Sequence, residues 1–383
     1  IIMKINGVLD NTKMYRLPYS KNDNPNGWIE VTTHCNMKCP GCYKGIDRKG
    51  LKVVHEPLDK IKSDILELKR IRNCGIITIT GGEALMHPQI EEIVSFTKSL
   101  KLRSFIHTNG ILINEATAIK LKKAGLTGFI VRVDTLNRPA FEKETQLHPL
   151  RSNIAALIKK VGELQLGFTA VVTQKNIAQI PTIVEWFQEN NDKTDYLVLI
   201  LKREFRFEQN EVLDTKDEAT IHELTSVLKT AFPDIAFSSY LGSRDKNIDF
   251  KWVQAAWLAS RGKVLGYADP RMVELSTVMA HFKNGNYSYV YNEGRNYVSF
   301  FQIMMGAFML KPMRRILWRL IKNPYNLFKK TNHQVINIVN PPGTSPESMG
   351  FCDACPDAVL YEGILQPSCI LESLIQLNKE KNA

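Results

Sequence analysis

The sequence lacks the features that would assign it to several simple protein classes. No run of about 18 uninterrupted apolar residues occurs among its 383 residues, so no spanning helix is predicted. Residues 1–10 have neither the basic start nor the apolar stretch of a signal peptide, and we therefore expect a cytoplasmic protein. No internal repeat is present. With 44% hydrophobic and 23% charged residues, the composition is that of a globular protein rather than a disordered chain.

Acidic residues are absent from one long stretch near the C-terminus. The chain has 50 Lys and Arg against 39 Asp and Glu, which gives a net charge of +11. Residues 294–346 contain no Asp or Glu but eight Lys and Arg, so most of the excess positive charge lies there. A basic balance favours a polyanion, a membrane surface or an acidic substrate, without choosing among them.

The same stretch predicts a basic amphipathic helix. Apolar residues recur at helical spacing in residues 313–322. The opposite face carries four basic residues: Arg314, Arg315, Arg319 and Lys322. The pattern fits a membrane-surface contact through residues 298–330, a core-packed helix with a solvated basic face, or nucleic-acid binding. Nucleic acid ranks lowest because exposed aromatic residues do not alternate with the basic ones.

Cysteine occurs in an odd number, seven, which does not suit a set of disulfides. Six of the cysteines form two tight triplets near the two ends of the chain: Cys35, Cys39 and Cys42, then Cys352, Cys355 and Cys369. In a reducing compartment, clustered thiols indicate metal ligands. The seventh, Cys74, ends a predicted helix and is expected to be a small buried apolar residue.

Short β-branched runs alternate with amphipathic segments between about residues 28 and 200. Strands are expected at 28–33, 76–80, 103–107, 128–134, 167–173 and 196–200. Helices are expected at 57–73, 89–100, 114–123, 152–163 and 177–190. Such alternation implies right-handed crossovers and a parallel sheet, either a partial barrel or an open doubly wound sheet. Farther along, a helix is expected at 218–230, whereas 249–294 is expected to be irregular with short helical segments.

Polar motifs follow the carboxyl ends of the expected strands. In chain order they are the first cysteine triplet, Gly81-Gly82-Glu83, Thr108-Asn109, Asp134 and Asn176. Because the site of a parallel α/β fold lies at that edge, these motifs should converge on one rim. Three thiolates within eight residues can bind three corners of a cubane iron–sulfur cluster and leave one iron open. A zinc site would need a fourth ligand, for which His34 is the nearby candidate.

The C-x3-C-x2-C motif after the first strand and the Gly-Gly-Glu motif after the second resemble the radical S-adenosylmethionine (SAM) superfamily. The resemblance covers about residues 28–202. It implies that Cys35, Cys39 and Cys42 hold a [4Fe-4S] cluster whose open iron is chelated by SAM. It further implies reductive cleavage of SAM to a 5′-deoxyadenosyl radical, which abstracts hydrogen from an unactivated carbon. An electron donor such as flavodoxin or ferredoxin is implied as a partner.

The resemblance also suggests residues for the SAM site. Gly81 and Gly82 let the backbone approach a ligand closely, and Glu83 would accept from the SAM ammonium group. Tyr43 is the candidate for packing on adenine, with core packing as the alternative. Weaker candidates, with turn, helix-cap or surface roles as alternatives, are Thr108, Asn109, Asp134 and Asn176. Among these, Asp134 would accept from the ribose hydroxyls.

The second triplet, C-x2-C-x13-C, encloses a sequence typical of a short hairpin. It resembles the C-terminal auxiliary-cluster extensions of many radical SAM enzymes, such as SPASM and twitch domains, although it has fewer cysteines. We expect a second [4Fe-4S] cluster at Cys352, Cys355 and Cys369, with zinc or no metal as alternatives.

The predicted fold is α/β, a partial (β/α)6 TIM-like barrel with a mixed C-terminal extension that carries a cysteine cluster. Five segments are expected: an N-terminal extension (1–24), a radical SAM core (25–205), a connecting or substrate region (206–294), a basic amphipathic segment (295–340) and an auxiliary cluster region (341–383). The predicted function is a radical SAM enzyme acting on an apolar or lipid-like small molecule. The alternatives are a peptide or natural-product maturase, and a non-catalytic metal-binding protein contacting RNA or membrane. No catalytic residue is predicted.

Overall fold

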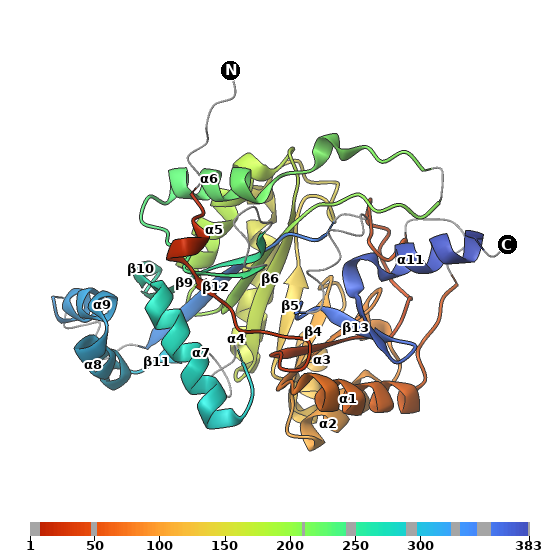
Figure 1. The fold of residues 1–383 in the computed structure, drawn as a ribbon, viewed down its shortest axis with the longest axis horizontal. Coiled ribbons are helices and arrows are strands. Elements are labelled where there is room, and N and C mark those ends of the chain that lie inside the picture. Colours follow the sequence, from red (N-terminus) through yellow and green to blue (C-terminus); the bar gives the residue numbers. More distant parts are fainter. Residues whose placement is uncertain are drawn as a thin grey trace.

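The computed structural model describes residues 8–46, 52–208, 211–242, 250–288, 297–322, 330–342 and 354–381. Its strands form one mixed sheet in the order β1-β8-β9-β12-β7-β6-β5-β4-β3-β2-β13-β14, with β10 beside β9 and β11 beside β12. The strands β2 to β7 are parallel neighbours and form the centre of this sheet (Figure 1). This is the predicted α/β class with an open, mostly parallel sheet.

The strands are β1 (Tyr15–Arg16), β2 (Asn26–Glu30), β3 (Ile76–Thr80), β4 (Arg103–Thr108), β5 (Gly128–Arg132), β6 (Gln165–Val172), β7 (Tyr196–Leu201), β8 (Ser239–Gly242), β9 (Phe250–Ser260), β10 (Lys263–Tyr267), β11 (Tyr297–Val298), β12 (Thr331–Val339), β13 (Ala358–Tyr361) and β14 (Ile364–Pro367). The α-helices are α1 (Leu58–Arg72), α2 (Ile90–Ser99), α3 (Glu115–Ala124), α4 (His148–Val161), α5 (Ile180–Glu189), α6 (Ile221–Ala231), α7 (Pro270–Asn284), α8 (Phe300–Met309), α9 (Lys311–Ile321) and α11 (Ser368–Lys381). The 3-10 helices are η1 (Asn11–Lys13), η2 (Ala84–Met86), η3 (Glu144–Leu147), η4 (Ile177–Gln179) and η5 (Thr215–Asp217).

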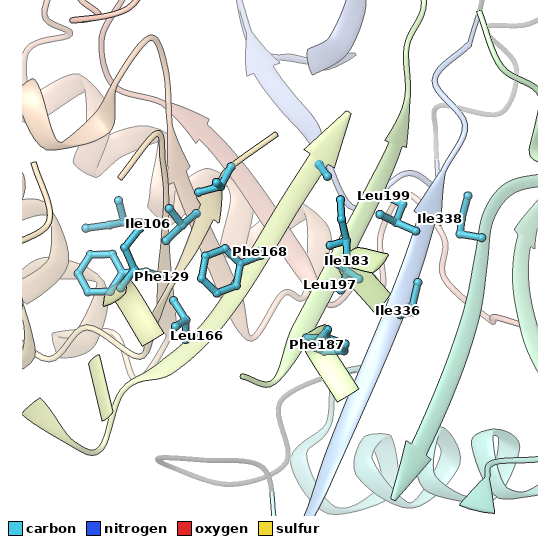
Figure 2. Packing of buried hydrophobic residues seen from close by; sticks show 14 of the residues in the cluster. Ile106, Phe129, Leu166, Phe168, Ile183, Phe187, Leu197, Leu199, Ile336 and Ile338 are labelled. Atoms are coloured by element: carbon cyan, nitrogen blue, oxygen red, sulfur yellow. The ribbon is translucent and has the colours of Figure 1, made fainter. Parts of the chain in front are cut away.

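The main hydrophobic core lies between the sheet and the helices that connect its parallel strands. Phe168 of β6 and Leu197 of β7 point to this side and pack with Ile183 and Phe187 of α5 (Figure 2). Because side chains alternate along a strand, the next residue, Thr169, points to the opposite face. One face of the sheet is therefore apolar and covered by helices, and the other can carry polar groups.

The six strands and six helices predicted up to residue 231 are all present, with ends shifted by a few residues. The prediction that 249–294 is irregular with short helical segments is wrong for β9 and β10, whereas the helix α7 does lie in this stretch. β9 is buried along its whole length, so it lacks the alternation of apolar and polar residues that reveals a half-exposed strand. β12 was also missed, since polar residues such as Asn332 and Gln334 interrupt its apolar pattern.

The predicted amphipathic helix is α9, and most of its apolar side is buried within the protein. Met313, Ile316 and Leu320 are buried against α8 and β10. The alternative of a core-packed helix with a solvated basic face therefore describes α9 itself. Within the described ranges, no helix combines the length and the apolar character needed to cross a bilayer. The predicted segment limits stay a prediction; the single sheet takes strands from all five segments.

A buried ion pair ties α4 to the loops at the carboxyl edge of the sheet. Arg151 and Glu144 are both fully buried, and Nη2 of Arg151 lies 2.5 Å from Oε2 of Glu144. The same Nη2 donates to the backbone oxygen of Val133, and Oε1 of Glu144 accepts from Thr135. The pair therefore joins the segments after β5 to the start of α4.

We expect Arg151→Met to lower the free energy of unfolding by about 3–5 kcal/mol, because it leaves the Glu144 carboxylate buried without its cation. Urea denaturation monitored by circular dichroism measures this loss. The control is Lys160→Met on the same helix, because Lys160 pairs with Glu115 at the exposed surface and should change stability by less than about 1 kcal/mol. Equal losses in the two variants would contradict the structural role of the pair.

Candidate active site at the carboxyl edge of the sheet

The first cysteine triplet lies in an irregular loop after β2. Cys35, Cys39 and Cys42 are each partly exposed, and they lie near enough to one another for their charges to interact. Burial raises the pKa of Cys35 and of Cys39, and the neighbouring cation of Arg132 acts in the opposite direction on Cys39. The three thiols therefore face a common site that already contains a positive charge.

The Gly-Gly-Glu turn packs directly against the backbone that enters the cysteine loop. The N–H of Gly82 donates to Thr32 O at 2.7 Å, and the N–H of Glu83 donates to His34 O at 2.8 Å. A Cβ on Gly81 would lie 2.3 Å from Thr32 O, and one on Gly82 would lie 2.4 Å from His34 O. The two glycines therefore allow the backbone of this turn to lie directly against the backbone of the cysteine loop. Contact with a ligand stays a prediction for both.

Glu83 is almost completely buried beneath this turn. Its carboxylate accepts from Thr108 Oγ1 at 2.7 Å, from the N–H of Asn109 at 2.7 Å and from the N–H of Leu85 at 3.1 Å. Burial raises the pKa of Glu83, and these three donors act against that rise. A carboxylate has about four acceptor positions, so one remains for the predicted ammonium group.

Thr108 and Asn109 join the turn to the cysteine loop from the end of β4. Besides contacting Glu83, Asn109 donates through Nδ2 to Asn36 Oδ1 at 2.6 Å and to Cys35 Sγ at 3.9 Å. The three predicted motifs after β2, β3 and β4 therefore form one hydrogen-bonded unit. Their convergence on one rim is what the parallel topology predicts, and their individual roles toward SAM stay predictions.

The site contains two arginines that the sequence analysis did not identify as site residues. Arg132, the last residue of β5, lies near Cys39 and Cys42 and pairs with Asp134 at 2.9 Å. Arg138 donates to Asn109 O at 2.8 Å and approaches Met37 Sδ at 3.1 Å, so it clamps the middle of the cysteine loop. For Arg132, the sequence did contain a signal, because it is a basic residue at the end of the otherwise apolar strand β5.

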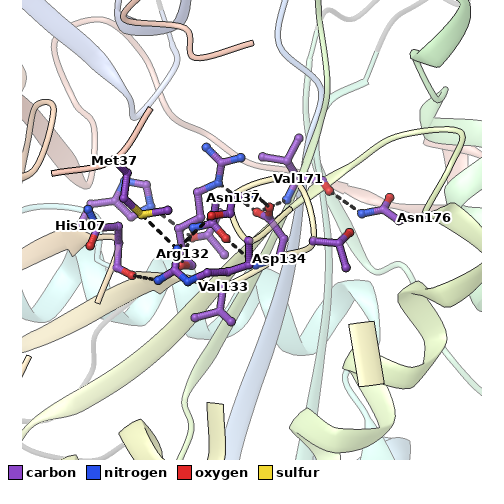
Figure 3. A network of polar contacts seen from close by, with 12 residues as sticks. Met37, His107, Arg132, Val133, Asp134, Asn137, Val171 and Asn176 are labelled. Atoms are coloured by element: carbon purple, nitrogen blue, oxygen red, sulfur yellow. Dashed lines mark hydrogen bonds and ion pairs between the residues drawn. The ribbon is translucent and has the colours of Figure 1, made fainter. Parts of the chain in front are cut away.

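Asp134 and Asn176 lie in a polar network behind the site (Figure 3). Asp134 is fully buried, and its oxygens accept from Arg132, from the N–H of Val171 and from the N–H of Asn137. The surface position considered as an alternative for Asp134 is therefore wrong. Asn176 is also buried; it accepts from the N–H of Thr173 and makes no side-chain cap bond to the helix that follows it. Their contacts hold loops together, and ligand roles for both stay predictions.

Tyr43 links the two cysteine groups. Its ring packs against a cluster that contains Phe207 and Ile370, as the core-packing alternative expected, and Cys369 packs against the same cluster. The ionised forms of Tyr43 and Cys42 would be close enough to repel each other. Burial, together with the Glu30 carboxylate, raises the pKa of Tyr43 well above its usual range. Its hydroxyl donates to Glu30 Oε1 at 3.4 Å. Contact of Tyr43 with adenine stays a prediction.

A buried lysine ties the cysteine loop to the C-terminal helix. Lys44 Nζ lies 2.5 Å from Glu30 Oε2 and 3.2 Å from Glu372 Oε2. Glu372 belongs to α11, whose first turn carries Cys369. The lysine between two carboxylates therefore fixes α11 beside the first cysteine loop.

The second triplet is only partly within the described residues, since Cys352 lies outside them. Cys355 and Cys369 lie near each other, and burial raises the pKa of Cys355 to about 12. The β13–β14 hairpin between them is present as predicted. The backbone around Cys355 is held by three core side chains: Asn24 donates to Ala354 O, Asn26 to Pro356 O and Arg72 to Cys355 O.

Cys74 is buried in the main core, as expected for a small apolar residue. Among the residues that the structure describes, no group of three or more His, Cys, Asp and Glu side chains could hold a single metal ion. A cubane cluster spreads its thiolate ligands over different irons. The first triplet fits such a cluster through its three half-exposed thiols, the donor Asn109 and the adjacent cation of Arg132.

The fold and the site together define a parallel α/β domain that presents three cysteine thiols at the carboxyl edge of its sheet. Residues 29–187 match the family model described as the radical SAM superfamily, and they form a radical SAM domain. The predicted resemblance is thereby confirmed. Members of this superfamily bind a [4Fe-4S] cluster and SAM, so these two cofactors are confirmed for the domain that residues 29–187 form.

Two curated relatives share this part of the chain. A probable GTP 3′,8-cyclase of Methanococcus maripaludis is 30% identical over 164 residues, which are 41% of this chain and 53% of that protein. An Fe-coproporphyrin III synthase of Methanosarcina barkeri is 24% identical over 178 residues, which are 45% of this chain and 43% of that protein. The chain thus spans about half the length of the curated relatives it matches. A solved structure of Streptococcus suis SuiB is 20% identical, with a TM-score of 0.42 over 55% of this chain and 46% of that one.

We expect Gly82→Ala to reduce iron bound at the first triplet, because its Cβ would displace the His34 backbone and with it the cysteine loop. Anaerobic reconstitution followed by iron and sulfide analysis measures the loss. The control is Gly162→Ala, where the new Cβ meets nothing within 4 Å but the backbone φ of +71° is strained. That variant should lose stability and keep its iron. Full iron loading in Gly82→Ala would show that the turn does not hold the loop.

Proposed function

We propose that this protein is a radical SAM enzyme that works at a membrane surface on an apolar, lipid-like substrate. Cys35, Cys39 and Cys42 would hold a [4Fe-4S] cluster, which would supply the electron for reductive cleavage of SAM and so make hydrogen abstraction from an unactivated carbon possible. The main support for an apolar substrate is the distribution of exposed apolar side chains. The reductant, flavodoxin or ferredoxin, is part of the proposal.

The residues of the cysteine site have distinct tasks in this proposal. Cys35, Cys39 and Cys42 hold the cluster, and Asn109 donates a hydrogen bond to the sulfur of Cys35. Glu83 orients the ammonium group of SAM. Thr108 and Asn109 donate hydrogen bonds that hold the Glu83 carboxylate in place. The positive charge of Arg132 supports the thiolate form of Cys39.

The C-terminal triplet is proposed to hold the second [4Fe-4S] cluster. Support comes from the hairpin that brings Cys355 near Cys369, and from the three donors that fix the loop around Cys355. Tyr43 lies near both Cys42 and Cys369, so one cysteine of each triplet is close to the same aromatic side chain.

Exposed apolar side chains gather on α7, α8 and α9. Nine of the seventeen large apolar side chains exposed in the described part of the chain belong to these three helices. They are Val278, Met279, Phe282, Phe300, Phe301, Met305, Phe308, Trp318 and Ile321. The three helices lie together at one side of the molecule, opposite α11 (Figure 1). Exposed apolar side chains gathered on neighbouring helices are typical of a membrane or partner contact.

The charges beside this surface favour an anionic membrane. Lys311 and Arg315 are exposed on α9, as is Lys322 directly after it, and residues 294–346 contain no acidic residue. Arg314 and Arg319 also carry charge, but their guanidinium groups donate to Ala307 O and Leu265 O, so they also hold the helices together. Basic residues at a bilayer surface attract anionic lipids by about 1 kcal/mol each.

Two variants test the membrane contact by flotation with vesicles of phosphatidylcholine and phosphatidylglycerol. Phe301→Ser with Phe308→Ser removes two exposed aromatic side chains and should reduce the floated fraction severalfold. Arg315→Gln with Lys322→Gln should reduce it roughly tenfold or more at low salt, since two basic contacts of about 1 kcal/mol each are lost. The control, Val212→Ser, changes an apolar side chain that is 92% exposed elsewhere and should float normally. Wild-type protein that stays with the unbound fraction would favour the maturase alternative.

Two cysteine variants test the two clusters. In anaerobic, reconstituted protein, Cys35→Ala should abolish the formation of 5′-deoxyadenosine from SAM after reduction. Replacing Cys352, Cys355 and Cys369 together with Ala should remove about four irons per chain, as expected for one [4Fe-4S] cluster. Unchanged iron in the triple variant would remove the second cluster from the proposal. An absence of 5′-deoxyadenosine in the wild type would favour the non-catalytic alternative.

A further inference from the structure

A cavity of about 480 Å³ lies beneath α7 and the α8–α9 hairpin. Its size falls in the range of sites that bind small molecules. β9, β12 and β10 form its floor, and α7 covers it together with the starts of α8 and α9. Its apolar lining includes Leu17, Ala256, Leu258, Val273, Val298 and Met313. It lies directly behind the helices that carry the exposed apolar surface.

One side of α7 faces this cavity along the length of the helix. Met272, Ser276, Ala280 and Lys283 line it at spacings of three or four residues, which places them on one helical face. Val278 does not line the cavity and is 52% exposed. The helix therefore separates the cavity from the exposed apolar surface.

Three lining residues mark where the cavity reaches the surface. Met279, Lys283 and Asn284 line it and are themselves exposed. Burial lowers the pKa of His333 to about 4, so this lining histidine is neutral at pH 7. Among the described lining residues, Lys283 is thus the one that is charged at that pH, and it sits at the opening.

The inner end of the cavity does not require a polar ligand. Ser239 Oγ donates to Gln254 Oε1 at 2.9 Å, and Gln254 Nε2 donates to Asn337 Oδ1 at 2.7 Å. These polar groups satisfy one another, and the lining also includes the apolar residues Leu17, Ala256 and Val335. Such an end suits a hydrocarbon, because burying an unpaired polar group of a ligand there would be unfavourable.

The cavity shares a sheet face with the cysteine site. Strand pairing places Gln254 opposite Asn337, Asn337 opposite Val198, and Val198 opposite Thr169. Thr169 is in turn opposite Arg132, which lies near Cys39 and Cys42. Directly paired residues project to the same side of a sheet. A chain lying on this face runs from the opening at α7 toward the thiols.

We propose that this cavity binds the hydrocarbon chain of an acidic amphiphile, with the chain under α7 and the acidic group at Lys283. This inference rests on the proposed function, because it identifies the apolar substrate as a long-chain acid delivered from the membrane surface. The apolar lining accounts for the chain, and the single cation at the opening accounts for the acidic group.

The probe for this site is dansyl-labelled undecanoic acid, used with the reconstituted protein below the concentration at which the probe self-associates. We expect its emission to increase on binding and palmitate to displace it. Ala280→Phe fills the cavity and should weaken binding roughly tenfold or more, since apolar contacts are lost. The control, Val278→Phe on the outer side of the same helix, should bind the probe as the wild type does. Equal binding by Ala280→Phe, or failure of palmitate to compete, would overturn the proposal.

A second variant covers the case in which Ala280→Phe does not fold. Lys283 is exposed, so Lys283→Gln should leave the fold intact and weaken the acid probe severalfold, with no effect on the corresponding dansyl-labelled alcohol. Unchanged binding of the acid would overturn the headgroup assignment. Flotation of Ala280→Phe separates the two proposals: normal flotation with normal probe binding contradicts the cavity alone, whereas wild-type protein that does not float contradicts the membrane contact itself.

Discussion

The contact between the Gly81-Gly82 turn and the backbone of Thr32 to His34 organises the site. Two backbone hydrogen bonds make this contact, and neither glycine could carry a Cβ without striking a carbonyl oxygen. This contact also sets the position of Glu83, because the turn directs the Glu83 carboxylate toward Thr108 and Asn109. Asn109 then reaches back to the cysteine loop. The cysteine loop, the Gly-Gly-Glu turn and the end of β4 are thus held together, and the first step is a contact between backbone atoms.

Much of the domain could be predicted from the sequence, because its strands and helices show strong periodicity and its motifs follow strand ends. The parallel topology then requires these motifs to share one edge. The role of Asp134 could not be predicted, since burial and the partners Arg132 and Val171 depend on tertiary packing. β9 and β12 were missed because one is buried on both faces and the other carries several polar side chains.

The amphipathic pattern of α9 shows a further limit of periodicity. It correctly predicted a helix with one apolar and one basic side. The sequence could not show that Met313, Ile316 and Leu320 cover another part of the same protein rather than a lipid surface. The exposed apolar residues that support a membrane contact lie mainly on α7 and α8. The sequences of these helices do not show the alternation of apolar and basic faces that identified α9. The cavity under α7 joins this surface to the sheet face that leads toward the cysteine site.

The central claim is that the three thiols after β2 hold a cluster with one iron open to SAM, next to the Gly-Gly-Glu turn. Electron paramagnetic resonance of the anaerobically reduced protein tests it most directly. Using protein in which Cys352, Cys355 and Cys369 are replaced with Ala isolates the first site. Addition of SAM should shift the cluster signal, because a new ligand enters the coordination shell of one iron. A signal that is unchanged by saturating SAM would contradict the account.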